Sequence, residues 1–582
     1  MIHSSCRLLL AALFLASSLS ARGAETNPAR LAEWREAKFG MFIHWGLYAA
    51  LAGSYNGKEI DNNGEWIMDR AMIPVAAYAA YAKDFNPVKF NADEWVRIAK
   101  TAGMKYLVIT AKHHDGFAMY PSKVSPFNLR DATPFTRDPL AELAAACRRE
   151  GLKFGVYYSQ AMDWHHPGGQ PPNRGWWDEA QHGDMTNYID TIAVPQVREL
   201  CSNYGPLFEL WWDMPRNMTP ELAGKLHAVV QELQPQVIMN NRLGGGVKGD
   251  IDTPEQYIPS PGGPEGRDWE TCMTMNNTWG FKRQDTDWKS SADLIRKLVD
   301  IAHKGGNFLL NVGPTAEGEI PAASVERLRE VGDWIAQNGE AIYGTTASPI
   351  PYLSWGRATR KGNILYLHVF DWPADGQLRV PMQVKVTGAH LLCRPDEQLR
   401  IEPATAGFVV RLPLGGATLL SPPGERRAAD GGRSAAAPGT ATPAVVKLTI
   451  EGVPVVAPPL TRNQPATASF GDAKKAFDGS AGRSWEANKG DKAGWVEVDL
   501  QRPAPVAALA FDEPHRGAGK RGQKYRLQAR VGDAWTNLVT GETKGYGTAT
   551  NFPALTAQVF RLEIFESKDT AAVAEFQLYR PE

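Results

Sequence analysis

The run Phe208-Glu-Leu-Trp-Trp-Asp213 is a short, almost continuous apolar segment that ends in a carboxylate. Similar runs are Phe39–His44, Lys105–Thr110, Phe154–Ser159, Val237–Asn240 and Phe308–Val312. Strands that are buried on both faces of a parallel sheet show this pattern. Stretches that read as amphipathic helices lie between them, namely Ala92–Ala102, Leu140–Glu150, Ala292–His303 and Ala323–Asn338. The alternation over about 300 residues predicts a (β/α)8-type barrel.

Most of these runs end in a polar side chain. The endings are His44, Thr110, Ser159, Asp213 and Asn240. Because the carboxyl ends of the strands form the active face of a barrel, we expect these side chains to lie together there. Asp213 also follows two Trp residues, which could pack against a ligand and limit the access of water. The alternative interpretation is a helix N-cap or a loop aspartate.

The overall composition is that of a globular protein. Of the 582 residues, 43% are hydrophobic and 22% are charged, and a chain of this length is expected to form about two to four domains. Lys and Arg number 63 against 64 Asp and Glu, so the charge gives no reason to expect nucleic acid or an anionic membrane as a partner. The 18 Trp favour a carbohydrate ligand, because flat rings pack against sugar C–H faces.

The chain begins like an exported protein. Arg7 precedes an apolar stretch from Leu8 to Leu19, which is typical of a signal peptide and too short to span a bilayer. We predict a signal peptide over residues 1–24 and export to the periplasm or the medium. Cys6 would be removed with the signal peptide, which leaves Cys147, Cys201, Cys272 and Cys393. They are too scattered to predict a disulfide framework or a cysteine-based zinc site.

Three folded units are predicted. The barrel pattern covers residues 25–343. Over residues 344–420, alternating runs separated by turn residues predict a small antiparallel β domain. Residues 421–444 are rich in Pro, Gly, Ala and Ser and form a linker by composition. Residues 445–582 are predicted to form a third, all-β unit.

Eight motifs occur in order along the barrel region: Phe39–Gly46, Gly64–Trp66, Thr110–Phe117, Tyr157–Ser159, Leu210–Asp213, Asn241-Arg242, Trp279-Gly280 and Asn307–Pro314. Together they resemble the motifs of family 29 α-L-fucosidases, over roughly residues 34–343 and into the β domain that follows. The resemblance implies a retaining exo-α-L-fucosidase that acts on fucosylated glycans and needs no cofactor for catalysis. It also implies that Asp213, at the end of the fourth strand, is the nucleophile.

Glycoside hydrolysis needs a second carboxyl group that protonates the leaving oxygen. Two candidates lie downstream of Asp213: Glu255 and Glu270. Glu255 follows Arg242 at a spacing similar to the proton donor of one branch of the family, and Glu270 matches the position used by another branch. We prefer Glu255. Either residue could instead be a glutamate in a structural ion pair.

The resemblance also assigns pocket residues. Glu65 and Trp66 match a hydroxyl-binding glutamate and a sugar-stacking tryptophan, and further matches are Tyr158, Trp211, Arg242 and Trp279. His44, His113 and His114 could bind hydroxyl groups, because each imidazole nitrogen donates or accepts according to its tautomer. Three histidines can also hold zinc, but no H-E-x-x-H spacing occurs and we predict no metal ligands. Any of these side chains could alternatively only pack in the core.

The third unit resembles a discoidin (coagulation factor 5/8 type C) β-sandwich. The matching segments are Ala476–Gly479, Ser484-Trp485, Gly494–Leu500, Tyr525–Ala529 and Ala574–Tyr579. Such a module implies either a second carbohydrate partner of galactose type or a structural role in docking. A structural calcium ion near Asp478 is a further expectation from this resemblance.

Two other functions compete with the fucosidase. One is a related barrel hydrolase that acts on another deoxy sugar or L-sugar. The other is a glycan-binding protein without turnover, against which Asp213 and the two candidate glutamates argue. Trp269–Cys272 and Trp279–Phe281 resemble the broad-acting branch of the family more than the branch restricted to branched α1,3/1,4-linked fucose.

Overall fold

The computed structural model describes residues 28–263, 266–414, 442–479, 483–514, 522–543 and 547–581. The predicted signal peptide and nearly all of the predicted linker lie outside these residues. No helix of the described residues is long and apolar enough to cross a membrane.

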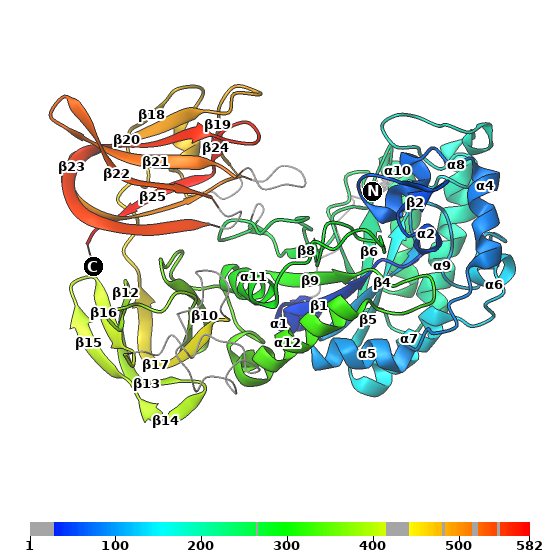
Figure 1. The fold of residues 1–582 in the computed structure, drawn as a ribbon, viewed down its shortest axis with the longest axis horizontal. Helices are drawn as coiled ribbons and strands as arrows, with labels where there is room; N and C mark the ends of the chain where they lie inside the picture. Colours follow the sequence, from blue (N-terminus) through cyan, green and yellow to red (C-terminus); the bar gives the residue numbers. More distant parts are fainter. Residues whose placement is uncertain are drawn as a thin grey trace, which may run out of the picture.

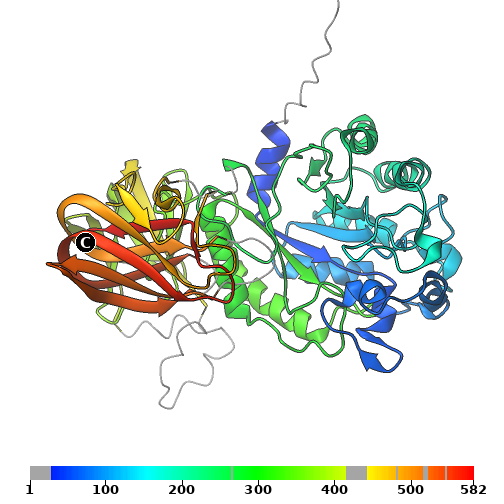
Figure 2. The same ribbon diagram turned by 90° about the horizontal axis from the view of Figure 1, so that it is seen from above.

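Seven parallel strands form the sheet of the first unit (Figure 1). They are β1 (Phe39–Ile43), β4 (Tyr106–Lys112), β5 (Lys153–Ser159), β6 (Glu209–Asp213), β7 (Ile238–Met239), β8 (Glu270–Thr274) and β9 (Asn307–Val312). Their order in the sheet is β7-β6-β5-β4-β1-β9-β8. The sheet is curled, with helices on its outer side (Figure 2). The main helices are α1 (Pro28–Ala37), α5 (Ala92–Thr101), α7 (Pro139–Glu150), α9 (Val194–Asn203), α10 (Pro220–Leu233), α11 (Ser291–Lys304) and α12 (Ala322–Asn338).

An irregular segment closes the ring between the outer strands β7 and β8. Isolated parallel bridges join Asn240 to Ile251, Asp252 to Trp269 and Glu255 to Cys272. Residues 251–255 therefore take the place of a regular strand, and the predicted (β/α)8-type barrel is confirmed. The segment ends at Glu255, which is thereby held beside the carboxyl half of β8.

Helix caps show why several helices begin where they do. Asp138, Thr219 and Ser290 each accept a hydrogen bond from a main-chain N–H in the first turn of α7, α10 and α11. A proline follows the first two of these caps, and its fixed φ suits the first helical position. Each such cap stabilises its helix by about 1 kcal/mol.

Alternation along the strands divides their side chains between two cores. Leu210 and Trp212 of β6 pack in the large core that includes the helices, whereas Trp211 packs with Phe42 in the small core inside the barrel. Glycine makes room for large inner side chains: a Cβ at Gly40 would lie 2.4 Å from the ring of Tyr106. The inner positions of β6 are therefore Glu209, Trp211 and Asp213, from the amino end to the carboxyl end.

The second unit consists of two antiparallel sheets. One has the order β10-β11-β17-β13-β14 and the other β12-β16-β15. Their bounds are β10 (Gly356–Lys361), β11 (Ile364–Val369), β12 (Gln377–Val380), β13 (Gln383–Leu391), β14 (Arg394–Gln398), β15 (Arg400–Ala404), β16 (Gly407–Arg411) and β17 (Ala444–Val455). The sequence assigned the segment from residue 445 to the third unit, but β17 pairs with β11 and β13. The chain thus returns across the linker to complete the second unit.

The third unit is β-rich, and its main sheet has the order β18-β20-β23-β21-β22, with β25 paired to β20. The bounds are β18 (Ala466–Ala468), β19 (Trp485–Glu486), β20 (Gly494–Asp512), β21 (Lys524–Val531), β22 (Ala534–Glu542), β23 (Thr548–Glu566), β24 (Ala572–Val573) and β25 (Glu575–Tyr579). Among the contacts of the described residues that link this unit to the second one, the hydroxyl of Tyr352 donates to Asp512, and Arg357 donates to the carbonyl of Gly547 at 3.3 Å.

Candidate active site

A cavity of about 180 Å³ opens at the carboxyl end of the barrel strands. Its lining residues are Phe42, His44, Asn63, Glu65, Trp66, Arg70, His113, His114, Trp211, Asp213, Met214, Arg242, Glu255 and Trp279. Pockets for drug-sized ligands measure roughly 300–1,000 Å³, so this cavity suits a ligand of about one sugar ring. The structure thus brings together ten of the twelve predicted site residues.

Asp213 is the last residue of β6 and is 9% exposed. Its Oδ1 accepts a hydrogen bond from Arg242 Nη1 at 2.9 Å, and its Oδ2 accepts one from the hydroxyl of Tyr157 at 2.9 Å. Burial acts to raise the pKa of Asp213, but Arg242, His114 and the Tyr157 hydroxyl together hold it below its usual value. The carboxylate is therefore ionised at neutral pH.

Arg242 joins the two carboxylates of the pocket. The same Nη1 that donates to Asp213 also donates to Glu255 Oε2 at 2.9 Å. Its Nε donates to Thr253 Oγ1 at 2.9 Å and its Nη2 to the Thr253 carbonyl at 3.0 Å. The guanidinium also lies over the ring of Trp211, 4.7 Å from its centroid. These contacts fix the guanidinium in one orientation between Asp213 and Glu255.

The structure separates the two acid/base candidates. Glu255 lines the pocket with a side chain that is 37% exposed. Glu270 is fully buried at the first residue of β8, which is the amino end of the barrel, and the hydroxyl of Tyr106 donates to it. Of the two candidates, Glu255 therefore lies in the pocket with Asp213, and Glu270 does not line it.

Two histidines in the pocket have a tautomer that their neighbours determine. Asn311 Nδ2 donates to the Trp279 carbonyl, so its Oδ1 accepts from His44 Nδ1 at 2.7 Å. The Ser159 hydroxyl donates to the Met162 carbonyl, so it accepts from His114 Nδ1 at 2.7 Å.

In both histidines Nδ1 therefore carries the proton and Nε2 is left as an acceptor. Burial lowers the pKa of both residues to about 4, so both are neutral at physiological pH.

Glu65 presents a third acceptor. Its Oε2 accepts from the main-chain N–H of Gly280 at 2.8 Å, whereas the buried Oε1 has no hydrogen-bond partner among the described residues. Burial raises the pKa of Glu65 to about 7. An unpaired buried oxygen costs free energy, and a ligand hydroxyl would remove that cost.

Aromatic rings form the other walls of the pocket. Trp279 lies 5.0 Å from His44 between ring centroids, and Trp66 lies edge-on to His114 at 5.3 Å. At the mouth, the guanidinium of Arg70 lies over Trp66 at 5.2 Å. His113 also lines the pocket, and burial lowers its pKa.

Tyr158 was expected in the pocket but faces away from it. Its hydroxyl donates to Gln196 Oε1 at 2.8 Å, in the outer core. Tyr157 faces the interior instead and contacts Asp213. Strand register could have revealed this, because Tyr157 pairs with Trp211 and Ser159 with Asp213. Neighbours in adjacent strands share a face, so the inward residues of β5 are Tyr157 and Ser159.

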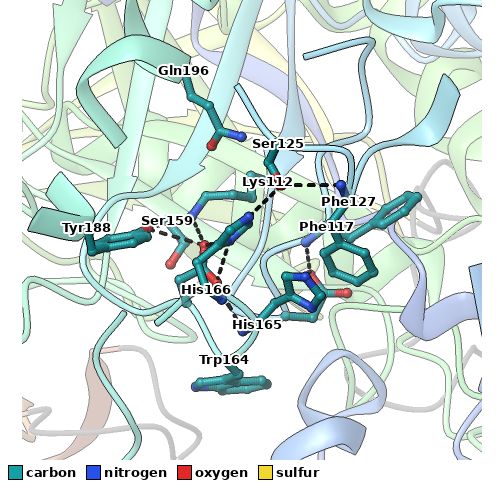
Figure 3. A network of polar contacts seen from close by, with 12 residues as sticks. Lys112, Phe117, Ser125, Phe127, Ser159, Trp164, His165, His166, Tyr188 and Gln196 are labelled. Atoms are coloured by element: carbon teal, nitrogen blue, oxygen red, sulfur yellow. Dashed lines mark hydrogen bonds and ion pairs between the residues drawn. The ribbon is translucent and has the colours of Figure 1, made fainter. Parts of the chain in front are cut away.

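A buried polar network supports the turn that fixes His114 (Figure 3). Lys112 Nζ donates to Asp163 at 2.7 Å, and His166 Nδ1 lies 2.9 Å from the same carboxylate. Burial acts to raise the pKa of Asp163, but His166 and Lys112 hold it well below its usual value. His166 Nε2 contacts the Ser125 hydroxyl at 2.7 Å. Asp163 follows the Met162 carbonyl that orients Ser159, so the network stabilises this turn.

The described residues contain no group of three or more His, Cys, Asp or Glu placed to hold a metal ion. Asp478, which we expected near a calcium ion, pairs with Arg483 at 3.5 Å. No finding tests the calcium ion, which stays a prediction.

Comparisons with known proteins agree with this geometry. The α-L-fucosidase family model matches residues 15–340, and the F5/8 type C domain model matches residues 460–576. An α-L-fucosidase of Branchiostoma floridae is 32% identical over 413 residues, which cover 66% of this chain and 89% of that protein. The human plasma α-L-fucosidase is 32% identical over 384 residues, covering 61% and 79%.

Solved structures show the same likeness. The α-L-fucosidase from Vibrio sp. strain EJY3 superposes with a TM-score of 0.72 at 28% identity, over 96% of this chain and 98% of that one. Isoenzyme 1 from Paenibacillus thiaminolyticus gives a TM-score of 0.62 at 37% identity, over 73% and 99%.

The barrel, with its paired carboxylates at the carboxyl end of the strands, is that of a glycoside hydrolase. Within that class, the chain belongs to the α-L-fucosidase family, family 29, and carries a C-terminal F5/8 type C domain.

Proposed function

We propose that the chain is a retaining exo-α-L-fucosidase in which Asp213 is the nucleophile and Glu255 the acid/base. The observation that carries this proposal is the bridge from Arg242 Nη1 to both carboxylates, at 2.9 Å each, in a pocket of one-sugar size. Two oxygens bound to one nitrogen cannot be farther apart than twice that distance. Retaining enzymes hold their carboxyl groups about 5–5.5 Å apart, and inverting enzymes about 6.5–9.5 Å.

The reaction follows a double displacement. Asp213 attacks the anomeric carbon as the bond to the leaving oxygen breaks, and Glu255 gives its proton to that oxygen. Glu255 then takes a proton from water, which attacks the fucosyl–Asp213 ester and releases fucose with its original configuration. The partial exposure of Glu255 suits this exchange, because the leaving group and the water both pass that side chain.

The acceptors of the pocket suit a sugar with several hydroxyl groups. No N–H or O–H of the described residues donates to His44 Nε2, His114 Nε2 or Glu65 Oε1, so each can accept from a hydroxyl. Phe42, Trp66, Trp211 and Trp279 supply apolar surface for ring C–H groups and for a C6 methyl. Such a wall would reject the CH₂OH of galactose by only roughly tens- to hundredfold.

Further proposals concern the rest of the chain. The substrate is a fucosylated glycan, with the broad linkage preference that the Trp269–Cys272 and Trp279–Phe281 segments suggest. The F5/8 type C domain would either bind a second carbohydrate or have a structural role in which it docks against the rest of the chain. We also propose export after removal of residues 1–24. Export agrees with the likeness to a plasma α-L-fucosidase.

The test is release of fucose from an aryl α-L-fucoside, followed by proton NMR. We expect α-L-fucose as the first product; the β-anomer would contradict retention. Azide should rescue Asp213→Gly by forming a fucosyl azide, and the same should hold for Glu255→Ala but not for Glu270→Ala.

Absence of turnover with tight glycan binding would favour the non-catalytic alternative. Turnover of another deoxy sugar alone would favour the related hydrolase.

A further inference from the structure

Glu209 and Glu270 occupy the floor of the barrel, beneath the pocket. They are the first residues of β6 and β8, and both are fully buried. Glu209 shares its face of β6 with Trp211 and Asp213, because side chains alternate along a strand. Neither carboxyl group takes part in the reaction described above. Burying two acids that have no cationic partner costs free energy, so their presence needs an explanation.

The two carboxyl groups lie within hydrogen-bonding reach of each other. The Tyr106 hydroxyl donates to Glu270 Oε2, whereas no N–H or O–H of the described residues donates to either oxygen of Glu209. A proton held between the two groups would give them a hydrogen bond to each other, with Glu209 as donor and Glu270 as acceptor.

The charged surroundings favour such a proton. Burial raises the pKa of both carboxyl groups, and the negative potential of Glu270 and of Asp250 raises that of Glu209 further. Asp250 itself is paired with Arg30 of α1. Among the described residues, no Lys, Arg or His forms an ion pair with either floor glutamate; adjacent carboxyls without a cation cannot both ionise readily.

Trp211 connects this floor to the pocket. Its indole packs in the same small core as Tyr106, whose hydroxyl donates to Glu270. Tyr157 stacks on the indole at 5.6 Å between centroids, and Arg242 lies over it at 4.7 Å. Both Tyr157 and Arg242 donate to Asp213. Trp211 therefore lies between the floor glutamates on one side and the residues that bind Asp213 on the other.

We propose that Glu209 and Glu270 share one proton as a carboxyl pair, and that this pair positions Trp211 and, through it, Arg242 and Tyr157 around Asp213. Glu209 and Glu270 are positioning residues, and the catalytic part of this inference rests on the proposed function. Deprotonation of the pair at high pH places two like charges in the floor and weakens both the fold and the positioning.

Glu209→Leu and Glu209→Gln test the pair, with Glu513→Gln as the control. Glu513 is another buried carboxyl, which accepts from Thr543 at 2.8 Å in the third unit. Leu cannot donate to Glu270, whereas the Gln amide can. We expect Glu209→Leu to lower kcat about tenfold per active site, counted by covalent labelling of Asp213, and Glu209→Gln to restore most of that loss.

Thermal unfolding gives a second readout that does not depend on activity. Because the pair has a raised pKa in the folded state, the wild type should lose stability as pH rises from 5 to 8. Glu209→Gln should lose clearly less than the wild type and than Glu513→Gln over the same range.

Equal pH dependence in the wild type and Glu209→Gln would overturn the shared proton, even if the protein proves inactive on fucosides. A loss of kcat in Glu209→Gln as large as in Glu209→Leu, or no loss in either, would overturn the positioning role. If Glu209→Leu does not fold, the Gln variant still decides both points.

Discussion

Tyr157 donates its hydroxyl to Asp213 Oδ2 at 2.9 Å from the neighbouring strand, while the adjacent Tyr158 points into the outer core. A hydrogen bond to an ionised group contributes roughly 1.5–3 kcal/mol. It also lowers the pKa of Asp213. The two tyrosines are therefore a matched pair for mutation: Tyr157 faces the inside of the barrel and Tyr158 faces the outer core.

Tyr157→Phe is expected to lower kcat/KM about 10- to 100-fold, because Asp213, the proposed nucleophile, loses one of its two side-chain donors among the described residues. Tyr158→Phe is the control: it removes a buried hydrogen bond to Gln196 outside the pocket and should change kcat/KM by less than about threefold. Steady-state kinetics with an aryl fucoside measure both. Equal losses in the two variants would contradict the assignment of Tyr157 to the site.

Arg242→Gln should shift the acid limb of kcat/KM to higher pH. Arg242 holds the pKa of Asp213 down, so removing its charge raises that pKa, and Asp213 then becomes protonated at a higher pH than in the wild type. We also expect a loss of roughly 100-fold or more in kcat/KM, because two carboxylates lose their shared partner. An unchanged acid limb in the pH profile would refute this role.

Binding of L-fucose should depend on the ionisation of Glu65. Burial raises the pKa of Glu65 to about 7, so the side chain gains its negative charge as pH rises through that value and becomes a stronger acceptor. In an Asp213→Asn background, calorimetry should show tighter binding at pH 8 than at pH 6. Adding Glu65→Gln should weaken binding and remove the pH dependence; a slope that persists would point to another group.

Two glycines are expected to respond oppositely to alanine. At Gly40 a Cβ would lie 2.4 Å from Tyr106, so Gly40→Ala should reduce the free energy of unfolding by about 1–3 kcal/mol. At Gly224, inside α10, a Cβ would meet nothing within 4 Å, so Gly224→Ala should increase stability by about 0.5–1 kcal/mol. Denaturant unfolding measures both signs.

The barrel and the place of Asp213 at its carboxyl end could be predicted from the sequence, because Phe208–Asp213 is a mostly apolar run that ends in a carboxylate. The choice between Glu255 and Glu270 could not. Residues 251–255 contain no apolar run, since the ring closes there through isolated bridges. For Glu270, the pattern does not say that the strand begins at this residue, which puts it at the opposite end of the barrel from the pocket.

Two other differences have equally local causes. The sequence marks Tyr157 and Tyr158 alike, and only the register with β6 decides which one faces inward. The strand β17 follows the linker in the chain, so its place in the second unit depends on pairing with strands more than about 50 residues away, which a local pattern does not encode.

The closing segment also has an evolutionary consequence. Asp213 is anchored in a regular strand whose displacement would disturb the whole ring, whereas Glu255 and Thr253 belong to a stretch held by single bridges. If Glu255 is the proton donor, insertions or deletions in that stretch would move it while the regular strands of the barrel stay in place. Such changes would leave Asp213 in place, so this stretch is where a designer should first vary the enzyme.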